Sequence, residues 1–327
     1  MSASGEGLHV LLADSGLGGL AVCAALERSL RACPDCRRLR LTYFNAAPDT
    51  QQGYNDQPDT PARAALLDRA LSAMEALRPD RIVLACNTLS VLYEHTAHAR
   101  RDAGRGRATG IVTGILEAGL RLFAGALASD PGGALLLLGT RTTIDSGIHR
   151  KRLLGLGLAP ERIGAISCHG LARAIEADPS GPEVRRLLEA CVPALPALGL
   201  RGERLYAGLA CTHYGFAAQA IAEALREATG LPVRILNPNE ALAEEVAEEI
   251  LAAGSAAAVS AGSGSQADDR HRADDRHRAG RPGITVRVLS RVALGESSRR
   301  AIAGRLDPVS ALTARALLSY TCDPDLF

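Results

Sequence analysis

The chain lacks an excess of charge of either sign. Its 327 residues include 37 Lys and Arg and 36 Asp and Glu, which gives a formal net charge of +1. A protein whose main partner is nucleic acid or an anionic membrane usually carries a marked positive balance or a basic patch. The near-neutral balance therefore favours small solutes as partners and gives no electrostatic case for nucleic acid.

Features of an exported or membrane-embedded chain are also lacking. The first residues, MSASGEG, have neither a basic segment nor a continuous apolar core, so no secretory signal is apparent. The uncharged stretch 205–222 approaches membrane length, but Cys211, Thr212, His213 and Gln219 lie within it, and bare polar groups are costly in a bilayer. The stretch 251–267 is too weakly apolar to insert. We expect a soluble cytoplasmic protein.

No pattern in the chain demands a metal or a cofactor. Eight cysteines occur, but without a secretory signal reducing conditions are expected, and disulfides are not. The single CxxC pair, Cys33 and Cys36, lacks a partner pair, so we interpret it as a loop after the first helix, with a zinc or redox role as the alternative. The glycines after Asp14 resemble a phosphate loop, but GxGxxG is absent, so nucleotide binding is weakly supported.

Short runs rich in Leu, Ile and Val alternate with longer stretches of helical spacing. We predict strands at 8–13, 39–44, 81–85, 134–138, 162–167, 205–210, 233–236 and 284–289, and helices that include 61–77, 182–190, 240–251 and 310–320. This alternation predicts βαβ units, and so an α/β fold with mainly parallel sheets covered by helices. Ligand sites in such sheets lie beyond the carboxyl ends of the strands.

The sequence contains two similar units. Asp14 and Cys86 each follow a predicted strand and are 72 positions apart. Thr140 and Cys211 also each follow a predicted strand, and they are 71 positions apart. A repeat on this scale suggests two similar α/β domains, which we place at 1–108 plus 218–327 and at 109–217, with the active site in the cleft between them. The alternative is that both cysteines are simply buried at strand ends.

The segment 254–283 differs from its surroundings. It begins rich in Ala, Ser and Gly and continues as the tandem repeat ADDRHR-ADDRHR, with almost no apolar residues. Such a segment cannot bury enough surface to offset its ordering entropy, so we predict a disordered insertion. Its histidines, His271 and His277, are six residues apart and would lie on different faces of a helix, so we expect no metal site.

Two opposed thiols can invert a stereocentre. A thiolate is strongly nucleophilic, and its unperturbed pKa of about 8.5 lies near neutral pH. With one thiol on each face of a substrate α-carbon, either can remove the proton while the other supplies one from the opposite side, without a cofactor. Cys86 and Cys211 would then titrate as a coupled pair, one ionised and the other protonated.

Polar residues beside the cysteines can assist this chemistry. Asn87, Thr88 and Thr212 follow the two thiols and can direct donors at a carboxylate. His213 could assist proton transfer at Cys211. Asp14 could play the same part for Cys86 or hold an ammonium group.

Each assistant also has a structural interpretation. Asp14 and Ser15 could cap a helix that begins near Gly19, because Asp and Ser are preferred N-cap residues. Thr140 and Thr143 could likewise be caps. His213 could be a core histidine with satisfied hydrogen bonds.

Four motifs resemble glutamate racemases and the wider aspartate/glutamate racemase superfamily: DSGLGGL at 14–20, CNT at 86–88, GTRTTIDS at 139–146 and CTHY at 211–214. The resemblance covers about residues 8–250 in the same order. It implies a cofactor-independent racemase in which Cys86 and Cys211 are the acid/base residues, assisted by Asp14 and His213. It also implies contacts with the amino acid from Ser15, Asn87, Thr88, Thr140, Thr143 and Thr212.

The chain departs from that family at three places. A Pro-Tyr-Gly loop usually helps to bind the substrate, and the corresponding region here is 51–54, so we assign Gln52 and Gly53 to substrate binding. His149 stands where the family often has Tyr, and the segment 237–239 lacks an acidic residue often found there.

The resemblance implies conversion of L-glutamate to D-glutamate for peptidoglycan in a bacterial cytoplasm. It also implies a homodimer, because family members often form dimers. Racemisation of aspartate or a hydantoin is the related alternative. From other classes, the alternatives are an inactive protein that binds an amino acid and a dithiol redox switch, which would require the two sulfurs to approach disulfide distance.

Overall fold

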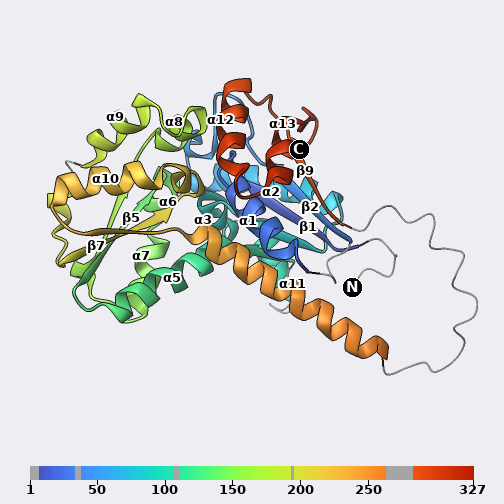
Figure 1. Cartoon of the computed structure of the whole chain (residues 1–327), viewed down its shortest axis with the longest axis horizontal. Helices are drawn as coiled ribbons and strands as arrows, with labels where there is room; N and C mark the ends of the chain where they lie inside the picture. The colour runs from blue at the N-terminus through green and yellow to red at the C-terminus, as the bar shows by residue number, and fades with distance from the viewer. Residues whose placement is uncertain (1–6, 34–37, 106–110, 193–194, 263–282) are drawn as a thin grey trace, which may run out of the picture.

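The fold is built on two parallel sheets that lie side by side (Figure 1). The computed structural model describes residues 7–33, 38–105, 111–192, 195–262 and 283–327. The first sheet contains β1 (His9–Asp14), β2 (Arg38–Asn45), β3 (Arg81–Leu84), β4 (Val112–Gly114), β9 (Gly283–Ser290) and β10 (Thr321–Cys322). The second contains β5 (Gly133–Gly139), β6 (Ile163–Ser167), β7 (Arg204–Ala210) and β8 (Val233–Leu236).

The two sheets repeat one strand order. The first runs β10-β9-β2-β1-β3-β4 and the second runs β6-β5-β7-β8, with parallel pairing throughout the recorded ladders. The block β2-β1-β3-β4 therefore has the same order as β6-β5-β7-β8. The predicted α/β fold with two similar units and parallel sheets is confirmed, and β1 and β3 correspond to β5 and β7.

Central strands are buried on both faces, as their apolar sequences require. All seven residues of β5 are buried, which is typical of a parallel strand covered by helices on both sides. Side chains alternate across a strand, so Leu136 and Leu138 enter one core cluster while Leu135 and Leu137 enter another. The polar residues that follow such a strand are thereby held at a fixed edge of the sheet.

Helices cover both faces of each sheet (Figure 1). Those of the first unit are α1 (Leu20–Leu30), α2 (Thr60–Ala76), α3 (Asn87–Tyr93), α4 (Ala97–Arg105), α11 (Pro238–Gly262), α12 (Glu296–Leu306) and α13 (Ala311–Leu318). Those of the second are α5 (Ile115–Ser129), α6 (Arg141–Asp145), α7 (Ile148–Gly155), α8 (Leu171–Ala177), α9 (Pro182–Cys191) and α10 (Ala218–Thr229). Helix α11 packs against both α1 and α5 and so joins the two units.

The predicted domain boundaries differ from the sheets at two points. β4 completes the edge of the first sheet although the prediction began the second domain at 109, and β8 pairs with β7 although the prediction returned to the first domain at 218. The apolar runs alone do not show which neighbour a strand will pair with. The division into domains otherwise stays a prediction.

The segment 254–283, which was predicted to be a disordered insertion, includes regular structure at both of its ends. Helix α11 continues to Gly262 and β9 begins at Gly283, so 254–262 is helical and 283 belongs to a strand. The Ala-rich sequence after 251 explains the extension, because Ala has the highest helix propensity. His271 and His277 lie outside the described residues, as does Cys36. Within the described part of the chain, no helix is both long and apolar enough to span a bilayer.

The core of the first unit predicts a large penalty for truncating Leu12. This side chain on β1 is fully buried, and its removal would leave a cavity. Leu12→Ala is expected to lower the free energy of unfolding by about 2–5 kcal/mol, measured by urea denaturation. The control is Leu156→Ala, since Leu156 is 64% exposed and its truncation is expected to cost less than about 0.5 kcal/mol. Equal losses in both variants would contradict this account of the core.

Candidate active site

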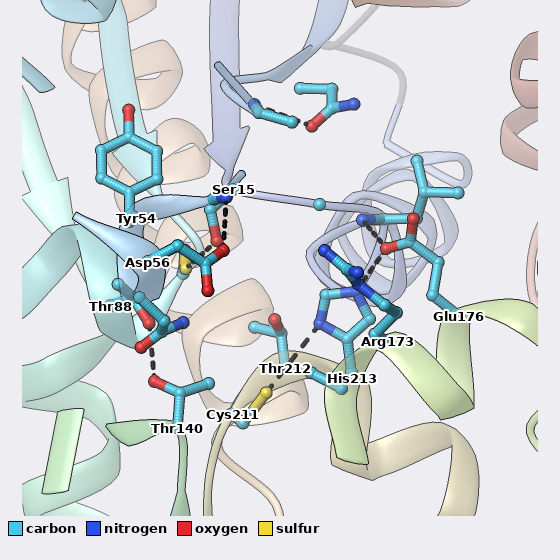
Figure 2. Close-up of a pocket in the computed structure, with 18 of the residues that line it drawn as sticks. Ser15, Tyr54, Asp56, Thr88, Thr140, Arg173, Glu176, Cys211, Thr212 and His213 are labelled. Atoms are coloured by element: carbon cyan, nitrogen blue, oxygen red, sulfur yellow. Dashed lines mark hydrogen bonds and ion pairs between the residues drawn. The ribbon is translucent and has the colours of Figure 1, made fainter. Parts of the chain in front are cut away.

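A cavity of about 460 Å³ lies at the carboxyl ends of the central strands and is lined by both units. This volume is suitable for a small-molecule ligand. Figure 2 shows Ser15, Tyr54, Asp56 and Thr88 on one side, facing Thr140, Cys211, Thr212 and His213 on the other. The predicted site residues that line the cavity are Ser15, Gly53, Cys86, Asn87, Thr88, Thr140, Cys211, Thr212 and His213.

Cys86 and Cys211 reach the cavity from equivalent positions. Cys86 is the N-cap residue of α3, two positions after the end of β3, and Cys211 is the N-cap residue of the 3-10 helix η7 (Thr212–Ala217), directly after β7. Each is only 5% exposed, and both line the same cavity. Both thiols therefore belong to the wall of one shared cavity.

The surroundings of Cys86 favour its protonated form. Its sulfur lies 3.2 Å from the hydroxyl oxygen of Ser15. Burial raises the pKa of Cys86 to about 12, and the nearby charge of Asp14 adds to the increase. Cys86 is therefore a thiol at neutral pH and can act as a proton donor.

Cys211 has a different set of neighbours. Its sulfur lies 3.9 Å from Nδ1 of His213, whose Nε2 lies 2.8 Å from Oε2 of Glu176. Burial alone would lower the pKa of His213, but its interactions with Cys211 and Glu176 outweigh burial and raise this pKa well above its ordinary value. The core-histidine interpretation is therefore incomplete, because the ring is hydrogen-bonded but also contacts the thiol and the cavity.

Glu176 belongs to the site and was not identified from the sequence. It lies on α8, lines the cavity and also accepts a hydrogen bond from the backbone N–H of Leu17 at 3.0 Å. Burial would raise its pKa, but the hydrogen bond with His213 and the charge of that ring lower it. The carboxylate thus joins the loop after β1 to His213 of the other unit.

Asp14 lies behind the cavity rather than on its wall. It is fully buried, and it accepts hydrogen bonds from Gly16 N at 3.0 Å and from the Thr212 hydroxyl at 2.7 Å. Burial raises the pKa of Asp14 above its ordinary value. It does not cap α1, which begins at Leu20 with Gly19 as its N-cap residue, so that structural alternative is wrong. Asp14 is therefore a positioning residue for Thr212.

Three threonines join the two units on the opposite side. The hydroxyl of Thr88 lies 2.9 Å from that of Thr140 and 3.3 Å from that of Thr143, and the last two are 3.0 Å apart. Thr140 makes no side-chain cap bond although it is the N-cap residue of α6. Thr143 is buried and does not line the cavity, so it supports Thr88 and Thr140 instead of facing a ligand.

The structure does not place Gln52 at this cavity. Oδ1 of Asp49 accepts hydrogen bonds from the backbone N–H groups of Gln51 and Gln52, at 2.7 and 3.3 Å, which fixes a turn at this point. The exposed Gln52 lines a neighbouring hollow with Gln57 and Arg69. Gly53, the other residue assigned to this loop, does line the cavity.

The remaining departures from the family pattern do not line the cavity. Asn239 is buried and donates to the carbonyl oxygen of Thr212 at 3.1 Å, so it supports the loop after β7. His149 is buried on α7 beside Phe123. No group of three or more His, Cys, Asp and Glu that could hold a metal ion occurs among the residues that the structure describes.

Comparisons with known proteins identify the family of the chain. Residues 15–246 match the family model described as Asp/Glu/Hydantoin racemase. The chain is 32% identical over 246 residues to a glutamate racemase of Granulibacter bethesdensis, an alignment that covers 73% of this chain and 77% of the relative. A glutamate racemase of Symbiobacterium thermophilum is 30% identical over 238 residues, which is 72% of this chain and 76% of that protein.

Solved structures show the same fold at lower identity. A glutamate racemase from Campylobacter jejuni superposes with a TM-score of 0.61 at 20% identity, covering 92% of this chain and 98% of that one. A glutamate racemase isoform from Bacillus anthracis gives 0.60 at 21% identity, covering 98% and 97%. The chain belongs to the aspartate/glutamate/hydantoin racemase family. It is accordingly an amino-acid racemase, an isomerase.

The glycines after Asp14 allow the two units to approach closely. A Cβ atom at Gly18 would lie 2.5 Å from the Thr212 hydroxyl oxygen and 2.6 Å from the backbone nitrogen of His213. At Gly16 it would lie 2.8 Å from Oε2 of Glu176. The glycines therefore allow the backbone of one unit to contact the loop after β7 of the other.

Adding a methyl group at Gly18 is expected to disrupt this contact. Gly18→Ala should lower the free energy of unfolding by about 1–3 kcal/mol through overpacking and should reduce racemase activity, because Thr212 and His213 must shift. The measurements are urea denaturation and a racemisation assay. Gly125→Ala is the control: this site on α5 has no atom within 4 Å of a new Cβ, so the variant should be as stable as the native protein or more so. If Gly18→Ala retained the native free energy of unfolding and the native racemase activity, this result would contradict the close contact.

Replacing Glu176 by Gln is expected to lower the pKa of His213, because the raised value depends partly on that carboxylate. The attraction between the imidazolium and Glu176 stabilises the fold below pH of about 6.5, the unfolded pKa of His, and is lost as pH rises through the raised folded pKa. Glu176→Gln should therefore destabilise the protein at pH 6 and have a smaller effect at high pH.

NMR titration of His213 and urea denaturation across pH measure these two effects. Glu183→Gln is the matched control, since the Glu183–Arg186 pair is exposed and lies on α9. An unchanged titration of His213 in Glu176→Gln would show that the carboxylate does not hold the proton on this ring.

Proposed function

We propose that this racemase interconverts L- and D-glutamate without a cofactor, by proton transfer at Cys86 and Cys211. The observation that carries the proposal is that the two thiols line one cavity from equivalent strand ends of two similar units. The relatives that are 30–32% identical to the chain are named glutamate racemases, which supports glutamate as the substrate to test first.

In the proposed reaction one sulfur removes the α-proton and the other returns a proton to the opposite face. Cys86 is a thiol at neutral pH and supplies the proton in one direction. Cys211 is the base in that direction, with His213 as its proton partner at 3.9 Å. In the reverse direction the roles exchange, so the pair returns to its starting state after a forward and a reverse turnover.

Polar groups at the cavity wall are suited to hold the reacting amino acid. Asn87 and Thr88 occupy the first turn of α3, where free backbone N–H groups favour an anion, and Thr212 occupies the equivalent place in η7. A carboxylate bound there would be oriented with the α-carbon between the sulfurs. Fixed donors also stabilise the charge that develops when the α-proton leaves.

This activity would supply D-glutamate for peptidoglycan synthesis in the cytoplasm of a bacterium. A homodimer stays a prediction of the family resemblance, to be tested by the mass of the particle in solution. Racemisation of aspartate or a hydantoin is the related alternative, and the same assay distinguishes these substrates.

Incubation with L-glutamate in heavy water tests the proposal. The native protein should introduce deuterium at the α-carbon and form the D-isomer, detected by NMR and circular dichroism. Cys86→Ser and Cys211→Ser should each lower the rate of racemisation by about 10²–10⁴-fold, the usual contribution of a general acid or base. The stability of each variant is checked by its urea midpoint.

Cys322→Ser is the matched control, because Cys322 is exposed on β10 and does not line the cavity. It should retain native activity. If neither deuterium nor D-isomer forms, glutamate is not the substrate, and exchange of aspartate or a hydantoin would then identify the alternative. Full activity in Cys86→Ser or in Cys211→Ser would contradict the two-thiol mechanism.

A further inference from the structure

The loop between β2 and α2 forms one wall of the cavity, and two of its carboxylates line that wall. Asp49, Gln51, Gly53, Asn55 and Asp56 all line this wall. Figure 2 shows the Asp56 carboxylate directed into the cavity, on the side of Ser15 and Thr88. A side chain of a bound amino acid that extends towards this part of the loop would meet the Asp56 carboxylate.

Backbone N–H groups of this loop that could bind a substrate carboxylate already have acceptors. Oδ2 of Asp56 accepts from the N–H of Gly53 at 2.7 Å, and Oδ1 of Asp49 accepts from Gln51 N at 2.7 Å and Gln52 N at 3.3 Å. Two carboxylates of the chain thus occupy these three donors. An ionised carboxylate only accepts hydrogen bonds, so it offers nothing to a second carboxylate.

The loop is held in place around Asp56. Tyr54 is only 1% exposed and is part of the core of the first unit. Arg63 donates to the carbonyl oxygens of Tyr54 and Gln57, at 3.1 and 2.9 Å. Oδ1 of Asn55 accepts from Thr142 N of the second unit at 3.0 Å. These bonds on both sides of Asp56 oppose a movement that would carry its carboxylate out of the cavity.

Positive groups also face the cavity from the second unit. Arg173 donates to the carbonyl oxygen of Gln51 at 3.0 Å, and its charge helps to lower the pKa of Glu176. Arg141 lines the cavity from α6. These charges offset part of the negative charge of the lining, whereas the carboxylate of Asp56 is hydrogen-bonded only within its own loop among the recorded bonds.

We propose that Asp56 is a specificity-determining residue that disfavours a substrate with a carboxylate side chain relative to its uncharged amide counterpart. The inference rests on the proposed racemisation in this cavity: glutamate is a substrate there, but its charged side chain binds more weakly than the side chain of glutamine. Glutamate and glutamine are the natural probes, because they differ in charge but hardly in size. Like charges placed face to face across a binding site are strongly unfavourable.

Asp56→Asn is the informative variant. Its side-chain oxygen can still accept from Gly53 N, so the turn is retained while the charge is removed. Titration calorimetry with L-glutamate and L-glutamine should show that the variant improves the affinity for glutamate by about tenfold, with a change of less than about twofold for glutamine. Deuterium exchange at the α-carbon of the two amino acids provides the corresponding ratio of kcat/KM.

Asp59→Asn is the control, since it removes a carboxylate from the same loop outside the cavity, where Asp59 caps α2. It should leave the ratio of affinities unchanged. A ratio that is unaffected by Asp56→Asn, or that moves equally in Asp59→Asn, overturns the inference, as does the absence of binding of both amino acids. If deuterium exchange persists but Asp56→Asn leaves the ratio of affinities unchanged, the inference is wrong and the proposed racemisation is unaffected. If Asp56→Asn changes the ratio of affinities but neither amino acid exchanges its α-proton, the inference is supported and the proposed racemisation is wrong.

Discussion

The hydrogen bond from the Thr212 hydroxyl to buried Asp14 is the interaction on which the site depends. A buried carboxylate must be satisfied by donors, and this one takes a donor from each unit, Thr212 and Gly16. Asp14 ends β1 and Thr212 follows β7, so the bond holds the ends of the two central strands together. Ser15 and Cys211 adjoin these two residues in sequence, and the same contact therefore sets the separation of the walls on which both thiols lie.

Much of the fold could be predicted because it follows from local patterns. Apolar runs of four to six residues separated by helical stretches identified the central strands, and matching polar residues after them identified the repeat. The short strands β4 and β10, with three and two residues, were missed because they carry almost no periodic signal. The Ala-rich extension of α11 was missed because low apolar content also characterises disorder.

The candidate site was predictable mainly where its residues lie within a few positions after the end of a strand. Cys86, Thr88, Thr140 and Cys211 do so, and they line the cavity. Glu176 lies within a helix, where a carboxylate usually faces solvent, and only tertiary packing brings it to His213. The loop after β2 was assigned by resemblance, which could not reveal that Asp49 and Asp56 occupy its N–H donors.

The two thiols occupy equivalent positions but have unequal neighbours, with Ser15 beside Cys86 and the His213–Glu176 pair beside Cys211. Mirror-image amino acids have identical free energies in water, so an enzyme that equilibrates them must reach a racemic mixture whatever its internal asymmetry. The Haldane relation then requires the same kcat/KM for both enantiomers. Unequal proton affinities around the sulfurs can make one enantiomer bind more tightly and turn over more slowly. Its lower KM must then be matched by a kcat that is lower by the same factor.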